Sequence, residues 1–259
     1  MIHTVVCTDV NDSVDWQCRL LEYTWKRAAQ SGELLRLVTC APDVTLPSHT
    51  HARVCRMDPQ PEQTMGYKAF ERLFALQQWL ERERPRGTVL ILDPDCVFRR
   101  AIHQPVEAGA PRAQHWVDYR CASELTQAAT WPMLIDAGDL QALLPSWIWF
   151  TAAVYRVTHR WESDMYALVS AASVRGLRFS LDAVGAYVGW PDELVGQAPI
   201  VHYCQDVVDD EGRTIWAKRS YRPWDAVPNA SRAKQAYCRD LLALVNEHAL
   251  QQRQTQPPG

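Results

Sequence analysis

The sequence lacks an apolar run that approaches the length of about 18 residues needed to span a bilayer. Its first residues, MIHTVVCTDVND, also lack the basic segment followed by an apolar segment that marks a secretory signal. These two absences argue against a spanning helix and an export signal. We therefore expect a cytoplasmic protein that has no membrane partner.

Closely spaced cysteine pairs are also absent. The eight cysteines include no CxxC pair, and neighbouring cysteines lie more than ten residues apart. Zinc sites usually need closer ligand pairs, so the spacing argues against one. Several cysteines stand in apolar, strand-like runs such as TVVCTDV. The pattern indicates buried free thiols in a reducing compartment.

Glycine is missing from the segment VVCTDVNDS, which includes the end of the first expected strand. A nucleotidyltransferase usually has a glycine-rich phosphate loop close to this point. Nucleotidyltransferases also use an α/β fold and metal-binding carboxylates, so this class is one possible function for the chain. The missing glycines argue against it.

The chain also has no large excess of positive or negative charge, because its net charge is −3 and its pI is about 6.2. This balance argues against a protein that coats nucleic acid, although it leaves room for a local basic patch. With 259 residues, 47% of them hydrophobic, the chain can form one large domain. We predict a single domain over 1–252, followed by a frayed polar tail (253–259).

Hydrophobic periodicity predicts an α/β fold. In the first part of the chain it indicates strands at 3–10, 34–40, 51–58 and 88–93, and helices at 13–30 and 66–84. In the second part it indicates helices at 123–131, 136–147, 147–176 and 232–252, strands at 177–182 and 199–204, and a loop over 204–229. This order is typical of a mixed, mostly parallel sheet flanked by helices, in which ligands bind beyond the carboxyl ends of the strands.

The segment TVLILDPDCVF contains the first candidate site. Asp93 and Asp95 follow an apolar strand and are separated by one proline. Two carboxylates with this spacing can hold a hard divalent cation such as Mn²⁺ or Mg²⁺, which can also bind phosphate oxygens. Asp and Pro are common turn residues too, so an ordinary turn at the strand end is the alternative.

Two further motifs contain candidate polar groups. His202 closes the apolar strand APIVHYC and could be a third metal ligand, although such a histidine is more often part of the core. Glu162 and Asp164 lie in WESDMYA at the start of a predicted helix. A carboxylate there could accept a proton from an acceptor hydroxyl, cap the helix, or stay solvated.

The segment WAKRSYRPW interleaves cations with aromatic residues. Lys218 and Arg219 could hold a diphosphate or a nucleic acid backbone, or they could belong to a solvated basic loop. The chain also has 11 tryptophans, several of them outside the strongest helices. Among these, Trp190 and Trp224 are candidates for stacking on a sugar or a base at an acceptor site, with a place in the core as the alternative.

Taken in order, these motifs resemble those of a glycosyltransferase family, the hydroxyproline O-arabinosyltransferases and peptidyl serine α-galactosyltransferases. The matching segments are CTDVNDSVDWQ, LRLVTC, LILDPDCVF, WESDMYA, IVHYC and AKRSY. They extend from the first strand almost to the last helix. The resemblance implies a GT-A fold, which is a Rossmann-like nucleotide-sugar-binding architecture, together with a UDP-sugar donor, a divalent metal that is usually Mn²⁺, and sugar transfer to a hydroxyl.

The resemblance also implies that the domain has a nucleotide-binding half (1–100) and an acceptor-binding half (101–252), and it implies roles for individual residues. Asp95 would be the main metal ligand, Asp93 would touch the metal or the ribose, and His202 would complete the metal shell. Donor contacts would come from Thr8, Asp9, Asn11, Lys68, Asp93, Lys218 and Arg219. Asp164 would act as the catalytic residue near the acceptor or the anomeric carbon, and Glu162, Trp190 and Trp224 would contact the acceptor.

Three departures from the family pattern qualify this expectation. The family's Asn-Lys-Pro motif is reduced to Lys68 in MGYKAF, Asp164 replaces a glutamate, and the membrane anchor is missing. The acceptor could therefore be a hydroxylated peptide side chain, a small molecule or a hydroxymethylated DNA base. A non-catalytic nucleotide-sugar-binding module is a further alternative, although such a module has no need for a metal shell.

Overall fold

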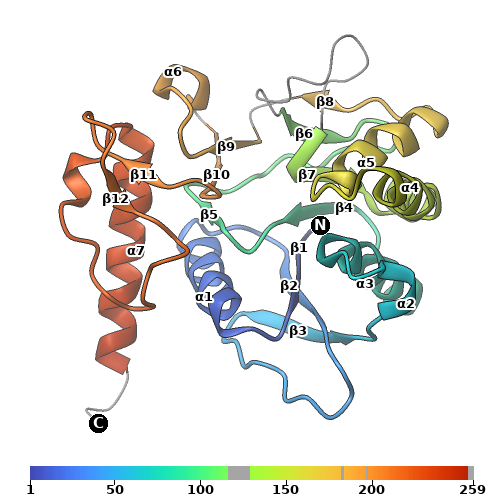
Figure 1. The fold of residues 1–259 in the computed structure, drawn as a ribbon, viewed down its shortest axis with the longest axis horizontal. Helices are drawn as coiled ribbons and strands as arrows, with labels where there is room; N and C mark the ends of the chain where they lie inside the picture. Colours follow the sequence, from blue (N-terminus) through green and yellow to red (C-terminus); the bar gives the residue numbers. More distant parts are fainter. Residues whose placement is uncertain (116–128, 182–183, 197, 256–259) are drawn as a thin grey trace.

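A computed structural model describes residues 1–115, 129–181, 184–196 and 198–255. Its largest sheet has seven strands in the order β3-β2-β1-β4-β7-β6-β8 (Figure 1). They are β1 (Ile2–Asp9), β2 (Glu33–Thr39), β3 (Ala52–Met57), β4 (Thr88–Leu92), β6 (Arg112–His115), β7 (Ala129–Asp136) and β8 (Ser180–Leu181). Strands β3, β2, β1 and β4 are parallel, and β7 runs antiparallel to both β4 and β6. The predicted mixed, mostly parallel sheet is confirmed.

Both faces of the sheet are buried, as its continuous apolar strands predict. Side chains alternate along β4: Val89 and Ile91 join the core cluster under α3 (Lys68–Glu83), whereas Leu90 and Leu92 join the cluster that also holds Leu21 of α1 (Asp12–Arg27). This alternation is the two-residue period of a strand. The sheet is therefore held between helices, as the predicted helices at 13–30 and 66–84 require, with the short α2 (Pro61–Thr64) before α3.

The helices of the second half differ from the prediction. One helix, α4 (Ala137–Thr158), continues through Pro145 and Trp147, and ends where His159 adopts φ +48°. A second helix, α5 (Ser163–Val174), packs on it. The predicted boundary at Trp147 was therefore wrong, because the apolar face of the chain continues through that position and the break occurs at the left-handed residue instead.

Two other predictions concern residues near the sequence gap. The helix predicted at 123–131 lies mostly outside the described residues, and its last residues, 129–131, belong to strand β7. The strand predicted at 177–182 is short, because only Ser180 and Leu181 pair, with Arg112 and Ala113 of β6. Strand β6 itself was not predicted. Its pairing partners are distant in the sequence, so no local pattern indicates it.

Two small sheets complete the fold. The first is β5-β10-β9, formed by β5 (Cys96–Phe98), β10 (Ile200–His202) and β9 (Gly185–Tyr187). The second pairs β11 (Val207–Val208) with β12 (Thr214–Trp216), within the predicted loop. The remaining helices are α6 (Asp192–Val195), the short 3-10 helix η1 (Ala230–Arg232) and α7 (Ala236–Thr255). Helix α7 extends into the predicted tail, and residues 256–259 lie outside the described part.

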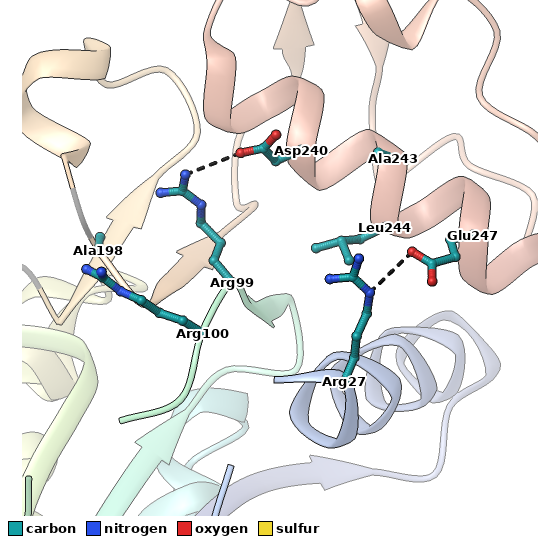
Figure 2. A pocket seen from close by; sticks show the side chains of 8 residues that line it. All are labelled: Arg27, Arg99, Arg100, Ala198, Asp240, Ala243, Leu244 and Glu247. Atoms are coloured by element: carbon teal, nitrogen blue, oxygen red, sulfur yellow. Dashed lines mark hydrogen bonds and ion pairs between the residues drawn. The ribbon is translucent and has the colours of Figure 1, made fainter. Parts of the chain in front are cut away.

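Helix α7 lies beside α1, on the outer side of the molecule (Figure 1). Two ion pairs connect it to the rest of the fold: Arg27 to Glu247, with 3.3 Å between the nitrogen and oxygen atoms, and Arg99 to Asp240, with 3.2 Å (Figure 2). A hydrophobic cluster that contains Trp16 of α1 also includes much of α7. The last helix is therefore part of the same packed body as the first helix.

In the described part of the chain, no helix is both long enough and apolar enough to cross a membrane. Seven of the cysteines lie in this part, and all seven are free thiols. Cys121 lies outside it. The expected cytoplasmic location stays a prediction.

Candidate active site

The polar residues of the candidate site gather at the carboxyl edge of the main sheet. Strands β1 and β4 are parallel neighbours, so their ends lie side by side. Strand β1 ends at Asp9, and Asn11 then caps α1 by accepting a hydrogen bond from the backbone N–H of Ser13 at 2.9 Å. Strand β4 ends at Leu92, immediately before Asp93. Open α/β sheets bind ligands at this edge.

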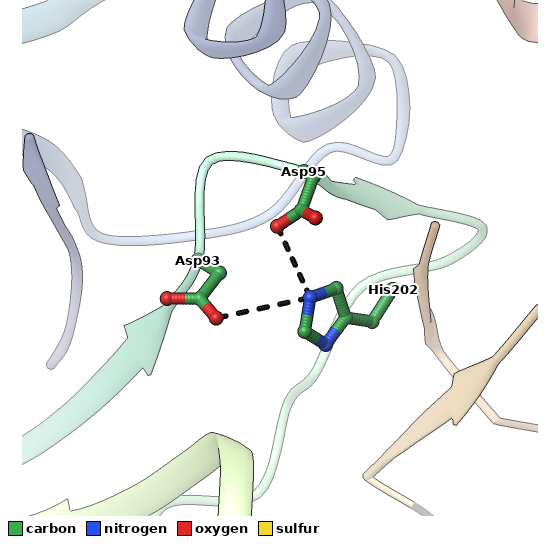
Figure 3. Close-up of side chains that lie close together, drawn as sticks. All are labelled: Asp93, Asp95 and His202. Atoms are coloured by element: carbon green, nitrogen blue, oxygen red, sulfur yellow. Dashed lines mark ion pairs between the residues drawn. The ribbon is translucent and has the colours of Figure 1, made fainter. Parts of the chain in front are cut away.

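His202 joins the two aspartates although it is more than a hundred residues away in sequence. Strand β10 pairs antiparallel with β5, and the register places His202 opposite Cys96. The backbone N–H of Tyr203 also donates to the carbonyl of Asp95 at 2.9 Å. In Figure 3 the three side chains converge: the Nε2 atom of His202 lies 3.1 Å from Asp95 Oδ1 and 3.7 Å from Asp93 Oδ2.

This triad fits a divalent cation. One oxygen from Asp93, one from Asp95 and one nitrogen from His202 all lie within 4.8 Å of one another. Two carboxylates and an imidazole are a suitable donor set for Mn²⁺, and the carboxylates also suit Mg²⁺. Behind them, the Nδ1 atom of His202 is buried and has no hydrogen-bond partner among the described residues. The predicted ligand set is therefore brought together, and it can hold a metal ion.

The electrostatics of the triad favour charged groups. Burial acts to raise the pKa of Asp95, but His202 and Lys218 outweigh it and hold the pKa of this carboxyl below its usual range. Burial acts to lower the pKa of His202, but Asp95 and Asp93 outweigh it and raise that pKa. The ammonium group of Lys218 contacts Asp95 Oδ2 directly. A positive charge therefore already stands against the carboxylate that is predicted to be the main metal ligand.

A second charged cluster adjoins the triad and is centred on Arg72 of α3. Its Nη1 atom lies 3.0 Å from Asp93 Oδ1, and its Nε atom lies 3.9 Å from Asp164 Oδ2. The guanidinium carbon is 5.0 Å from the centre of the Trp131 ring, which is a cation–π distance. Arg72 therefore connects a predicted metal ligand, Asp93, to the predicted catalytic residue, Asp164.

Asp164 is almost fully buried, with 2% of the residue exposed. The Tyr67 hydroxyl lies 2.5 Å from its Oδ1 atom and also contacts the carbonyl of Trp161. The indole N–H of Trp147 donates to the Asp164 carbonyl at 2.7 Å. Burial raises the pKa of Asp164, and nearby Arg72 and Tyr67 only partly oppose this. A buried carboxyl with a raised pKa beside a cavity is a typical catalytic candidate.

Two cavities meet at this cluster. One, of about 390 Å³, is lined by Asp93, Asp95, Asp164, His202, Lys218 and Arg219, together with Ala69, Arg72, Trp131, Trp161, Met165, Cys204 and Gln205. The other, of about 450 Å³, is lined by Thr8, Asp9, Asn11, Lys68 and Asp93, together with Cys7, Val14, Thr39, Ala69, Glu71, Arg72 and Pro94. Both volumes are typical of small-molecule sites. Because Arg72 and Asp93 line both cavities, the two form adjoining halves of one site.

All the predicted donor, metal and catalytic residues line one or both cavities, whereas the three predicted acceptor residues are not among the described lining residues. Glu162 is at the N-cap position of α5. Trp190 packs beside Tyr187, with 5.3 Å between ring centres, and Trp224 packs against His248 at 5.1 Å. Their acceptor roles stay predictions.

Sequence reasoning missed Arg72, Tyr67, Trp131 and Trp161 as members of the site. Arg72 lies four residues after Lys68, on the same face of α3, so helical spacing from a candidate donor residue could have indicated it. Tyr67 stands directly before Lys68. The burial of Trp131 and the 65% exposure of Trp161 depend on tertiary packing, and no local signal predicts them.

Other motif residues support the site from behind. Trp16 packs against Tyr203 and Tyr221, with ring centres 6.2 Å and 5.0 Å apart, and so connects α1 to the segments that carry His202 and Lys218. Asp15 accepts a 2.5 Å hydrogen bond from Arg36 of β2, whose side chain is 1% exposed. These motif residues therefore hold the scaffold of the site together.

The architecture and this site define a class: the chain has the GT-A glycosyltransferase fold. Two solved structures of the galactosyltransferase LgtC superpose on it. One, a complex with donor and acceptor sugar analogues, has a TM-score of 0.55 at 11% identity and covers 99% of this chain and 97% of that one. The other, an active-site mutant of the same enzyme, has a TM-score of 0.58 at 12% identity with the same coverage.

Two curated proteins are similar in sequence, and they bear out the resemblance seen in the motifs. A peptidyl serine alpha-galactosyltransferase of Arabidopsis thaliana is 24% identical over 247 residues, covering 78% of this chain and 30% of that protein. The hydroxyproline O-arabinosyltransferase NOD3 of Pisum sativum is 22% identical over 228 residues, covering 77% of this chain and 67% of that protein. The chain therefore spans less than a third of the length of the galactosyltransferase and about two thirds of the arabinosyltransferase. No protein-family profile matches the chain.

Proposed function

We propose that this chain is a metal-dependent glycosyltransferase that moves one sugar from a UDP-sugar to a hydroxyl group. The observation that carries the proposal is the triad of Asp93, Asp95 and His202 at the junction of two cavities, at the carboxyl edge of the sheet. The GT-A fold and the names of the similar proteins support the same reaction class. A bound Mn²⁺ or Mg²⁺ would supply positive charge that stabilises the leaving diphosphate.

The second cavity is suited to the nucleoside of the donor. Thr8, Asp9 and Asn11 at the end of β1 supply oxygen acceptors and donors for a uracil and a ribose. The Nζ atom of Lys68 lies 3.6 Å from Asp9 Oδ2, and the Lys68 side chain is largely exposed. Its ammonium group can therefore turn toward the donor at a small cost in free energy. We assign these residues to donor binding.

Lys218 and Arg219 are suited to the diphosphate. Both line the cavity that holds the triad, and together they can offset the charge of the diphosphate, including the further negative charge that develops as its bond to the sugar breaks. Arg219 adds a planar donor fork that matches phosphate oxygens. In this proposal the Lys218 ammonium leaves Asp95 for the phosphate when the donor binds.

Asp164 is our candidate for the carboxylate at the reacting centre. If the reaction inverts the anomeric carbon, its raised pKa suits a general base that takes the proton of the acceptor hydroxyl. If the reaction retains the configuration, Asp164 would position the substrate instead. Tyr67 and Arg72 hold the carboxylate in place in either case.

We propose only that the acceptor is a compound with a hydroxyl group. A hydroxylated peptide side chain, a small molecule and a hydroxymethylated DNA base stay open. The exposed ring of Trp161 at the cavity edge offers a surface for stacking a sugar ring or a base. Glu162 follows it directly in the chain, which keeps it near the acceptor side.

The proposal is tested by thermal shift and UDP release with a panel of UDP-sugars, with Mn²⁺ and with a chelator. Asp95→Ala removes a triad carboxylate, and Asp58→Ala, an exposed aspartate paired with Arg82, serves as the control. We expect one donor to raise the melting temperature and to be slowly hydrolysed by the wild type and Asp58→Ala, and only with metal. If no nucleotide sugar has any effect with or without metal, the transferase proposal fails. Pyrophosphate release from a nucleoside triphosphate would indicate a nucleotidyltransferase, and donor binding without turnover in the presence of acceptors would indicate a binding module.

A further inference from the structure

A group of arginines surrounds two adjoining cavities on the side of the fold away from the triad. The larger cavity, of about 730 Å³, is lined by Arg27, Arg99, Arg100, Arg112 and His103, among others. A smaller one, of about 390 Å³, shares the first three of these arginines. We call the two together the arginine cavity. Its lining residues differ from those of the candidate active site.

The fold explains how these residues meet. Arg27 lies in the last turn of α1, whereas the active site lies at the first turn; a 16-residue helix is about 24 Å long. Arg99 and Arg100 follow β5, and their backbone N–H groups donate to the carbonyl of Pro199 at 2.7 Å and 3.3 Å. Strand β5 begins directly after Asp95. The arginine cavity therefore occupies the opposite end of α1 and of β5 from the triad.

Four arginines line this cavity in a protein whose net charge is −3. None of the described residues that line its larger part is acidic. In the smaller part, Asp240 and Glu247 of α7 pair with Arg99 and Arg27 (Figure 2). The two carboxylates and Arg27 are largely exposed, and such ion pairs contribute little free energy. An incoming anion can therefore replace these carboxylates at small cost.

We propose that the arginine cavity binds a small anion that carries two or more phosphate groups. Guanidinium groups from two elements can hold separate phosphates, each through paired N–H donors. The cavity volumes match a small ligand. An extended polyanion such as nucleic acid is a poorer match, because most of its length would lie outside the cavity.

The test uses tripolyphosphate as the probe and isothermal titration calorimetry on the chelator-treated chain. Lys218→Ala/Arg219→Ala serves as the background, because it removes the proposed diphosphate contacts of the active site. We expect this background to retain one site for tripolyphosphate. Adding Arg99→Ala/Arg100→Ala should weaken that site by at least about tenfold, since two charge-assisted contacts are lost. Arg53→Ala/Arg82→Ala, which removes the same charge from exposed residues elsewhere, should leave it within about twofold.

A gain-of-binding variant guards against misfolding of the arginine variant. Asp240→Asn removes the carboxylate that competes for Arg99, and it should strengthen binding by about threefold. Absence of a site in the background, or binding that is unchanged by loss of Arg99 and Arg100, overturns the proposal. If Asp240→Asn leaves the affinity unchanged, Arg99 does not hold the anion and the proposal fails. A short DNA duplex that binds through these arginines when tripolyphosphate does not would mean a nucleic-acid surface instead.

Discussion

Tyr67→Phe tests the buried contact at the centre of the site, because it removes one hydroxyl and leaves the ring in place. The hydroxyl is 2.5 Å from Asp164 Oδ1 and 3.2 Å from the backbone nitrogen of Asp164, and Tyr67 itself is 6% exposed. Removing a partner from buried polar groups costs about 1–3 kcal/mol. In a domain of this size that cost lowers the melting temperature by about 2–10 °C.

The loss should depend on pH. Burial raises the pKa of Asp164, and the Tyr67 hydrogen bond opposes that rise by stabilising the ionised carboxylate. A carboxyl whose folded pKa is above its unfolded pKa binds more protons in the folded state, so its contribution to stability falls as pH rises between the two values. Without the hydroxyl the folded pKa rises further. The stability difference between wild type and Tyr67→Phe should therefore grow as pH rises through the pKa of Asp164.

Thermal unfolding from about pH 5 to pH 8 measures this difference. The control is Tyr155→Phe, whose ring stacks on Tyr67 with 4.5 Å between centres. The Tyr155 hydroxyl has no hydrogen-bond partner among the described residues. We therefore expect Tyr155→Phe to change the melting temperature little, and by the same amount at every pH. If Tyr67→Phe behaves like Tyr155→Phe, or loses less stability at the higher pH, the assigned contact does not stabilise an ionised Asp164.

Three further changes have definite expected outcomes. His202→Ala should weaken Mn²⁺ binding, measured by calorimetry, by at least about tenfold because one of three ligands is lost; unchanged affinity would rule out the triad. Gly185→Ala should lower the melting temperature, since its Cβ would lie 2.5 Å from the Pro132 ring and overpacking costs about 1–3 kcal/mol; an unchanged melting temperature would contradict this packing. His49→Gln should destabilise more in acid than in alkali. Burial acts to lower the His49 pKa, but Asp15 and Glu22 outweigh it and raise that pKa, so its contribution is complete below the unfolded pKa and is lost as pH rises through the folded one; urea unfolding at two pH values checks the sign.

The first half of the fold was predictable because its signals are local. Strands such as β4 are continuous apolar runs, α3 repeats apolar residues at helical spacing, and Asp93 follows its strand directly. Strand β6 has no such signal, because its pairing with β7 and β8 depends on distant residues. The α4–α5 boundary was misplaced for a different reason: two consecutive apolar helices form one continuous hydrophobic pattern in the sequence.

The same distinction between local signals and distant contacts separates the predicted residues of the candidate site from the missed ones. The motifs of the sequence indicated the three candidate metal ligands, the basic loop and Asp164, since each motif carries an uncommon combination of residue types. Arg72 was missed because its role depends on two carboxylates that approach it from different elements. Trp190 and Trp224 were chosen for their residue type, and the structure packs them beside Tyr187 and His248.

By itself, the sequence determined the alternation of strands and helices, the carboxylates after β4 and the order of the motifs, because these depend on neighbouring residues. Only the tertiary structure decided that His202 meets Asp95, since the β5–β10 register brings them together. It also decided that Asp164 is buried and that Arg72 is shared between two cavities. Burial and the distances between charges set both metal affinity and pKa, and packing between distant segments creates them.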